Sequence, residues 1–357
     1  MPAQPKVVIP AAELGDFVTA LFTKSVSSPQ HARTMSEVLL WASLRGVDSH
    51  GVARVPRYLE LLDSGEANPA PDIRLTPSAT AVAVLDADRA PGPVALTAAA
   101  DQAVLLARAS GIGAVAVRRT VHTGAIGYYT SRIAEQGLTG IAFVAGMPNM
   151  SYTGVKGAAV ATSPLSIAVP AAGRAPVLLD MATAGIALGK IAQYRNSGRP
   201  LPEGVAATAD GVPTTDPALA KLPLPLGGAK GAGMSLMFEL LTSVLVGAPI
   251  VSSFHTDLAQ GRAHRQNALL IALDPAAFGS GDEYPAAVAS TVDVLKGLPR
   301  ADEATAVRAP GEGGAQIATQ RAATGVPVAA KVWSELQIAA EKLSVPLPHP
   351  DRPDSAS

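Results

Sequence analysis

Residues 111–129 are Gly111-Ile112-Gly113-Ala114-Val115-Ala116-Val117-Arg118-Arg119-Thr120-Val121-His122-Thr123-Gly124-Ala125-Ile126-Gly127-Tyr128-Tyr129. The apolar run at 113–117 predicts a buried strand, and the turn at 122–127 leads into a segment with helical spacing. A Rossmann unit would carry Gly-x-Gly-x-x-Gly between such a strand and its helix. Here the paired glycines precede the strand. A nucleotide, if bound, must therefore bind to another architecture.

Short apolar runs alternate with helical segments on both sides of this stretch. The β-like runs lie at 81–85, 113–117, 140–144, 165–169, 177–179 and 267–273. The helical segments lie at 93–109, 125–136, 186–195 and 234–246. This alternation predicts a mixed α/β region.

The ends of the chain have a helical texture instead. Ser28-Pro29 is a helix start signal, and the helix it opens is expected to run to Gly46. Further helices are expected at 52–62 and 328–343, and the proline-rich segment 68–77 looks like a linker. A chain of 357 residues exceeds the roughly 250–300 residues that suit one core, so two lobes are expected.

The composition excludes several classes of function. Hydrophobic residues make up 48% of the chain and charged residues 16%, which argues against disorder. A formal net charge of −1 without Lys/Arg blocks gives nucleic acid no electrostatic footprint. There is no cysteine, so disulfides and thiolate metal sites are excluded.

Targeting signals are also missing from the sequence. The first residues, Met1-Pro2-Ala3-Gln4-Pro5, lack a basic region followed by an apolar one. Apolar runs such as 79–85 and 236–246 are too short or too interrupted to span a bilayer. We therefore expect a soluble, cytoplasmic protein with no nucleic-acid or membrane partner.

The segment Asp48-Ser49-His50-Gly51-Val52-Ala53-Arg54 places an imidazole beside a hydroxyl, with a guanidinium four residues further on. Glycines interrupt the helical pattern on both sides of His50, so we expect it at a helix junction that meets solvent or ligand. Histidine exchanges protons near neutral pH, and arginine holds a carboxylate through two parallel hydrogen bonds. This combination indicates chemistry on a small organic acid. Taken alone, the segment is better explained by a helix cap at Ser49 and a surface ion pair at Arg54, and the other motifs of the chain favour the functional interpretation.

Three glycine-rich turns are candidate ligand contacts. They lie at 122–127, at 227–233 around Lys230, and at 308–312, which is Arg308-Ala309-Pro310-Gly311-Glu312. A turn that opens a helix exposes backbone N–H groups, which favour phosphate. Each turn alone is better explained as a structural turn than as a ligand site. Together they fit a pyrophosphate and a nicotinamide.

Asp180-Met181-Ala182-Thr183 ends the strand predicted at 177–179 and can cap the helix that follows. The functional alternative is a backbone contact with a cofactor at the end of the strand. Lys190 lies in the following helix, where it is either a solvated lysine or part of the catalytic set.

Signatures of other chemistries are missing. Gly228-Ala229-Lys230-Gly231 lacks the spacing of a Walker A loop, and no Gly-x-Ser-x-Gly elbow occurs. No clustered set of three or four metal ligands is apparent, so we expect no metal site. His31, His255 and His264 have no spaced partners and are given no role.

With these residues assembled, the chain resembles the malate/L-lactate dehydrogenase family of the type-2, non-Rossmann kind. The family includes ureidoglycolate, sulfolactate and diketogulonate dehydrogenases and the piperideine/pyrroline-2-carboxylate reductases. The resemblance runs from about residue 48 to residue 343. Its motifs are Asp48-Ser49-His50-Gly51 with Arg54, His122-x-Gly124-Ala125-x-Gly127-Tyr128-Tyr129, Thr162-x-Pro164, Leu179-Asp180-Met181-Ala182-Thr183, Gly189-Lys190-Ile191, Leu201-Pro202-Glu203-Gly204, Asp210-Gly211-x-Pro213-Thr214-Thr215-Asp216-Pro217, Gly227-Gly228-x-Lys230-Gly231-x-Gly233 and Pro310-Gly311-Glu312.

The resemblance implies roles for the candidate residues. His50, oriented by Ser49, would exchange a proton with the substrate; in some relatives the residue matching His122 does so, and the choice stays open. Arg54 would hold the substrate carboxylate, and Thr162 would contact the substrate. The implied cofactor contacts are His122, Thr123, Gly124, Ala125, Ile126, Asp180, Met181, Ala182, Lys230, Arg308, Pro310, Gly311 and Glu312.

The resemblance also implies a fold and a reaction. We expect a helical domain at 1–78, with 313–357 packed near it, and an α/β (α+β) domain at 79–312 with a non-Rossmann cofactor-binding sheet. The expected protein is a homodimeric oxidoreductase that uses NAD(P)H, with NAD or NADP undecided. Its expected substrate is a small 2-oxo or 2-hydroxy acid resembling malate, lactate or sulfolactate.

Departures from the family pattern bear on the substrate. Ala184 and Ser163 stand where relatives often have Ser and Asn. Lys190 lies where the cyclic-imine reductases place an Asp that acts with Ser and His, which favours 2-oxo acids. Reduction of a cyclic imine carboxylate to a cyclic amino acid is the alternative within the family.

Two alternatives come from outside the family. A ligand-binding protein without turnover is disfavoured by the intact Ser49, His50 and Arg54. A phosphate-transferring enzyme is disfavoured because no Mg²⁺-binding carboxylate cluster accompanies Lys230.

Overall fold

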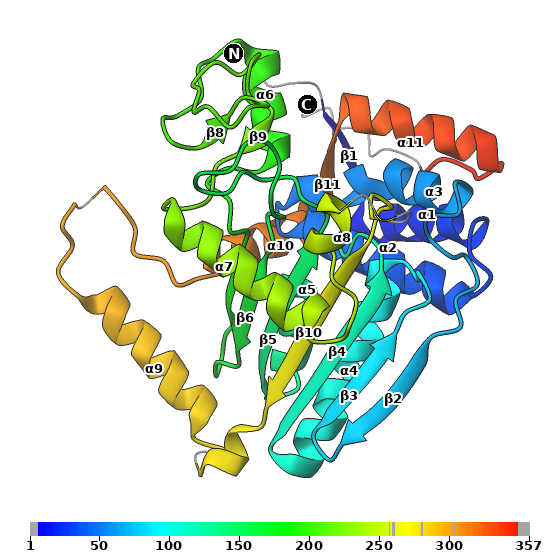
Figure 1. The fold of residues 1–357 in the computed structure, drawn as a ribbon. Helices are drawn as coiled ribbons and strands as arrows, with labels where there is room; N and C mark the ends of the chain where they lie inside the picture. Colours follow the sequence, from blue (N-terminus) through cyan, green and yellow to red (C-terminus); the bar gives the residue numbers. More distant parts are fainter. Residues whose placement is uncertain (1–5, 257, 259–260, 280, 303, 349–357) are drawn as a thin grey trace, which may run out of the picture.

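The computed structural model describes residues 6–256, 258, 261–279, 281–302 and 304–348 (Figure 1). Its centre is a seven-stranded sheet in the order β2-β3-β4-β10-β5-β6-β7. The strands are β2 Arg74–Ala79, β3 Val82–Asp86, β4 Ile112–Thr120, β5 Thr139–Gly146, β6 Leu165–Val169, β7 Val177–Met181 and β10 Gln266–Leu273. Neighbours are antiparallel except β3 and β4. A Rossmann sheet is mostly parallel, so the predicted non-Rossmann α/β architecture is confirmed.

The stretch at 111–129 forms a central strand, its turn and the start of a helix. β4 pairs with β3 and β10, and Val115 and Val117 are fully buried. Gly113 lets helix α4 (Gly92–Ser110) pack directly on the strand, because a Cβ there would lie 2.1 Å from the Ala103 carbonyl oxygen. The turn that carries His122 follows the strand.

Helices cover both faces of the sheet. On one face, α4 and α5 (Gly127–Ala134) share a buried core with β4, β5 and β10. On the other, α7 (Ala229–Glu239) and the π-helical turn η3 (Leu240–Val244) lie over β5 and β10 (Figure 1). The rings of Phe143 in β5 and Phe238 in α7 meet at 4.9 Å between centroids. The sheet is therefore the middle layer of three.

The first and last described elements meet beside the sheet. β1 (Lys6–Ile9) pairs antiparallel with β11 (Val326–Ala329). The helices of this part are α1 Ala11–Thr23, α2 Pro29–Leu44, α3 Val55–Asp63 and α11 Ala330–Leu343. They share one hydrophobic core, which confirms the expected helical part built from both chain ends. Its boundaries at 78/79 and 312/313 stay predictions, and residues 1–5 and 349–357 lie outside the described residues.

One segment at the border between the two parts differs from expectation. Residues 68–77 were expected as a linker, but their end contributes β2 to the edge of the sheet. Pro77 is tolerated there, because an edge strand leaves one side of its hydrogen-bond ladder unpaired.

The remaining elements surround these layers. They are η1 Asp48–His50, η2 Val52–Arg54, α6 Leu188–Ser197, β8 Ala206–Ala207, β9 Leu222–Pro223, α8 Val251–His255, η4 Pro275–Phe278, α9 Tyr284–Gly297 and α10 Glu312–Thr324. α6, β8 and β9 form an excursion between β7 and α7 (Figure 1). No helix of the described residues has the length and apolar character needed to cross a membrane.

Candidate active site

The predicted helix junction consists of the two short 3₁₀ turns η1 and η2, between α2 and α3. Gly51 joins them and packs closely on α2, since a Cβ there would lie 2.1 Å from Ser43 Oγ. From the other side, Arg321 of α10 donates to Asp48 Oδ1 at 2.6 Å. Contacts from α2 and from the C-terminal part of the chain therefore fix the place of His50.

We expect Gly51→Ala to destabilise the protein by about 1–3 kcal/mol. The added methyl group would displace Ser43, whose Oγ accepts the Val52 N–H at 2.9 Å. Calorimetric unfolding measures the loss. Gly233→Ala is the matched control, because nothing lies within 4 Å of a Cβ there and alanine favours a helix such as α7. Equal unfolding temperatures for the two variants would contradict this packing argument.

His50 lies half-buried at this junction with a hydroxyl beside it. Ser49 Oγ is 3.1 Å from His50 Nδ1, which leaves Nε2 for a ligand. Burial, together with the nearby Arg54 guanidinium, lowers the pKa of His50 to about 4. The ring is therefore neutral at pH 7 and can accept a proton.

The structure brings the second predicted histidine to the first. The rings of His50 and His122 stack with centroids 5.8 Å apart and an interplanar angle of 21°. Tyr58 Oη lies 2.9 Å from His122 Nδ1, and the Gly124 N–H donates to the same nitrogen at 3.3 Å. Burial, and then the charge of Arg54, hold the pKa of His122 well below its usual value. Both proton-exchange candidates thus belong to one site.

Arg54 lies at the edge of this pair. Its Nε donates to the Ser49 carbonyl at 2.7 Å, and its two terminal amino groups have no hydrogen-bond partner among the described residues. They are available for a ligand carboxylate.

The first turn of α6 approaches Ser49, since a Cβ on Gly189 would lie 3.9 Å from Ser49 Cβ. Lys190 follows it and is exposed.

Part of the backbone of the turn at 122–127 is already hydrogen-bonded within the protein. Three of its N–H groups donate to protein acceptors: Thr123 to Gln266 Oε1 at 3.0 Å, Gly124 to His122 Nδ1, and Gly127 to Asp180 Oδ2 at 2.9 Å. Thr123, Ala125 and Ile126 are buried. Buried N–H groups must find acceptors, and these find them inside the protein. The turn therefore holds the His122 ring in place.

Asp180 at the end of β7 ties that strand to α5 through its bond with Gly127. Part of the residue stays accessible. Desolvation of its carboxyl group raises the pKa of Asp180 to about 6, whereas the hydrogen bond from the Gly127 N–H and the charge of Arg45 lower this pKa. The turn at 308–312 lies against the same strand. The Leu178 N–H donates to the Pro310 carbonyl at 3.1 Å. Two separate predicted segments therefore border one surface.

The turn around Lys230 joins this surface from the other side. The Leu226 N–H donates to the Thr183 carbonyl at 2.8 Å, and the Thr183 N–H donates to the Thr162 carbonyl at 3.0 Å. Gly231 allows the approach, because a Cβ there would lie 2.5 Å from the Thr183 oxygen. Lys230 itself is exposed. Thr162, the end of β7 and the Lys230 turn are thus contiguous.

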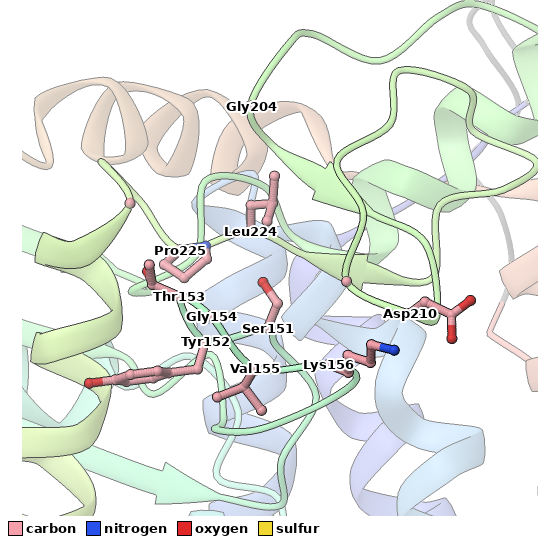
Figure 2. Close-up of a pocket in the computed structure, with 12 residues that line it drawn as sticks. Ser151, Tyr152, Thr153, Gly154, Val155, Lys156, Gly204, Asp210, Leu224 and Pro225 are labelled. Carbon is pink, nitrogen blue, oxygen red and sulfur yellow. The ribbon is translucent and has the colours of Figure 1, made fainter.

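A cavity of about 400 Å³ opens beside the Lys230 turn (Figure 2). It lies between the loop 151–156 and the excursion of β8 and β9, with Tyr152, Lys156 and Asp210 among its lining residues. His50, His122 and Arg54 do not line it. It neighbours the predicted cofactor surface without containing the two histidines.

Sequence reasoning misses three residues of the site. Tyr58 occupies a core-facing helical position, and Gln266 starts a strand, so neither has a distinguishing pattern. His264 acts electrostatically on the pKa of His122, and its Nε2 is buried without a partner among the described residues. The pairing of β4 with β10 brings Gln266 and His264 toward His122, and the packing of α3 brings Tyr58 there. No group of three potential metal ligands occurs among the described residues.

Comparisons with known proteins place these features in context. The family model described as malate/L-lactate dehydrogenase matches residues 9–337. Ureidoglycolate dehydrogenase (NAD(+)) of Escherichia coli K12 is 35% identical over 286 residues, covering 79% of this chain and 81% of the relative. The structure of sulfolactate dehydrogenase from Methanocaldococcus jannaschii is 29% identical with a TM-score of 0.85, covering 95% of this chain and 98% of the other. That of Δ1-piperideine-2-carboxylate reductase from Pseudomonas syringae is 28% identical with a TM-score of 0.80, covering 93% and 99%.

Proposed function

The chain belongs to the malate/L-lactate dehydrogenase family and is a hydroxy-acid dehydrogenase, and we propose that its substrate is a small 2-oxo or 2-hydroxy acid of the size of malate, lactate or sulfolactate. The stacked pair of His50 and His122, with the free amino groups of Arg54 beside them, carries the proposal. An acid/base group next to a carboxylate clamp fits this substrate class.

The surface around the end of β7 fits a nicotinamide dinucleotide. Gly311 packs so closely on β7 that a Cβ would lie 2.7 Å from Leu178 Cβ, so only glycine lets the turn at 308–312 lie against the end of this strand. Lys230 supplies an exposed cation at a glycine turn, which suits a pyrophosphate. The proposed contacts are Asp180, Met181, Ala182, Lys230, Arg308, Pro310, Gly311 and Glu312, with the turn His122, Thr123, Gly124, Ala125 and Ile126 nearest the histidines. A nicotinamide bound there supplies or takes up the hydride.

The protein side chains hold the substrate and move its proton. Arg54 holds the carboxylate, and Thr162 borders the substrate. One of the two stacked histidines accepts the hydroxyl proton when a 2-hydroxy acid is oxidised and returns a proton to the carbonyl oxygen when a 2-oxo acid is reduced. His50 is the first candidate for this exchange, and His122 is the alternative. A bound carboxylate offsets the Arg54 charge, which removes one cause of the lowered pKa of His50. Lys190, which follows Gly189 in the first turn of α6, is the remaining candidate of the catalytic set.

The experiment that tests this function mixes the protein with NADH or NADPH and a panel of 2-oxo acids and cyclic imine carboxylates. We expect loss of absorbance at the reduced nicotinamide band with 2-oxo acids. Loss of absorbance with the cyclic imines alone would assign imine reduction instead. The similarity to the piperideine-2-carboxylate reductase structure is the observation that supports this alternative. No loss with either class would contradict the proposal. Running both dinucleotides identifies the preferred one.

We also propose that two copies of the chain associate through α7, η3 and α9. The exposed large apolar side chains are Met237 on α7, Leu240, Leu241 and Val244 on η3, Leu245 directly after η3, and Val294 and Leu295 on α9. Large exposed apolar surfaces on a single chain mark the places where it contacts another protein. A second copy of the same patch would bury them without any other partner.

Leu245→Lys is expected to convert the dimer to a monomer, because it places a charge in the apolar contact. Sedimentation velocity measures the change. Leu105→Lys on α4 is the matched control, since Leu105 is 63% exposed and Leu245 is 64% exposed. A wild-type protein that sediments as a monomer, or a Leu245→Lys variant that stays dimeric, would refute this interface.

A further inference from the structure

Tyr58 lies on α3, buried against the turn that carries His122. It is 2% exposed, and its hydroxyl reaches two acceptors of one residue. The oxygen lies 2.9 Å from His122 Nδ1 and 3.1 Å from the His122 carbonyl oxygen. The rings of the two residues meet edge to face, with centroids 5.6 Å apart. Such a contact fixes the imidazole from one side.

The backbone fixes which nitrogen of His122 carries a proton. The Gly124 N–H can only donate, and it points at Nδ1 from 3.3 Å. In the neutral ring Nδ1 must therefore be the acceptor, so that the proton lies on Nε2. The Tyr58 hydroxyl can donate to Nδ1 or to the carbonyl in this state.

The protonated ring needs the opposite arrangement. Its Nδ1–H must find an acceptor, and the Gly124 N–H cannot serve. The charged groups that act on the pKa of His122 are Arg54, Arg57, His50 and His264, and all of them disfavour the cation. Glu66 accepts the His264 backbone N–H at 3.1 Å and faces that residue rather than His122. The Tyr58 oxygen is the acceptor that remains.

We propose that Tyr58 is a positioning residue for His122 whose hydroxyl reverses its hydrogen bond as the ring gains and loses a proton. It donates to Nδ1 of the neutral ring, and it accepts from Nδ1 of the imidazolium while it donates to the His122 carbonyl. In many histidine sites a carboxylate orients the ring; here a hydroxyl that both donates and accepts does so. For its effect on turnover the inference rests on the proposed function with His122 as the ring that exchanges the proton, whereas the hydrogen bond itself does not depend on that function.

Tyr58→Phe tests the proposal, with Tyr129→Phe as the matched control. Tyr129 is also buried and donates to the same turn, at the Thr123 carbonyl at 2.6 Å, without touching the imidazole. Nitrogen NMR of histidine-labelled protein at neutral pH reports whether Nδ1 accepts a hydrogen bond. We expect the Nδ1 signal of His122 to move toward that of a free acceptor in Tyr58→Phe and to stay in place in Tyr129→Phe.

Turnover supplies the second measurement. The imidazolium loses its acceptor in Tyr58→Phe, so kcat should fall by roughly tenfold relative to Tyr129→Phe, with KM little changed. An unchanged Nδ1 signal, or equal kcat values in the two variants, would overturn the proposal. A protein without turnover on any substrate would refute the proposed function, while the NMR result would still decide the hydrogen bond. If Tyr58→Phe fails to fold, a fluorotyrosine at position 58 keeps the shape, and an unmoved Nδ1 signal there would equally overturn the proposal.

Discussion

His50→Ala should lower kcat by about 10²–10⁴-fold while leaving the dissociation constant for the dinucleotide close to that of the wild type. The ring exchanges the substrate proton through Nε2, and alanine leaves no group at the junction to replace it. The proposed dinucleotide contacts lie on other elements, so they are retained. Single-turnover kinetics measure the first quantity, and fluorescence titration with the reduced dinucleotide measures the second.

The pH profile sharpens this test. Because the pKa of His50 is lowered to about 4, the free protein keeps a neutral base from that pH upward. The kcat/KM for oxidation should therefore hold as pH falls to about 5 and decline as it approaches the pKa of His50. His31→Ala is the control, since His31 lies at the start of α2 away from the site. Unchanged turnover in His50→Ala, with loss in His122→Ala, would transfer the proton exchange to His122.

Arg54→Ala should lower kcat/KM for a 2-oxo acid by roughly 10–100-fold, mainly through a higher KM. The terminal amino groups of Arg54 have no hydrogen-bond partner among the described residues. Their removal therefore takes away the group that binds the substrate carboxylate and breaks no hydrogen bond that these two groups make within the protein. Arg54→Lys should not restore the loss, because an ammonium cannot offer two parallel N–H groups. Steady-state kinetics on the same acid measure both variants.

The control for this prediction is Arg33→Ala. Arg33 is an exposed arginine of α2 that donates to Gln30 Oε1, so its loss removes the same charge from a distant surface. A KM in Arg54→Ala equal to that of Arg33→Ala would contradict the carboxylate clamp.

The architecture could be predicted from local patterns where the chain is strongly apolar. The run at 113–117 is buried on both faces, and it lies inside β4 as expected. β2 could not be predicted, because all its residues are exposed and it contains Pro77. Its pairing with β3 depends on the tight turn between them rather than on apolar spacing.

The candidate site could be predicted only as separate motifs. His50 and His122 each stood out, but their stacking depends on how α2, α3 and β4 pack. The turn at 122–127 is a candidate phosphate contact from its sequence, but Gln266 and Asp180, both distant in sequence, accept two of its N–H groups, which no local pattern shows. Tyr58 occupies a core-facing position of α3. Helical spacing predicts that its ring is buried, but it does not show that its hydroxyl reaches His122.

A structure with bound dinucleotide tests the central claim most directly. The account predicts that the nicotinamide ring lies beside the stacked pair His50 and His122, close enough for a substrate carbonyl carbon held by Arg54 to stand about 3–3.5 Å from the ring carbon that carries the hydride. Binding of the ring away from both histidines, for instance in the cavity lined by Tyr152 and Lys156, would contradict it.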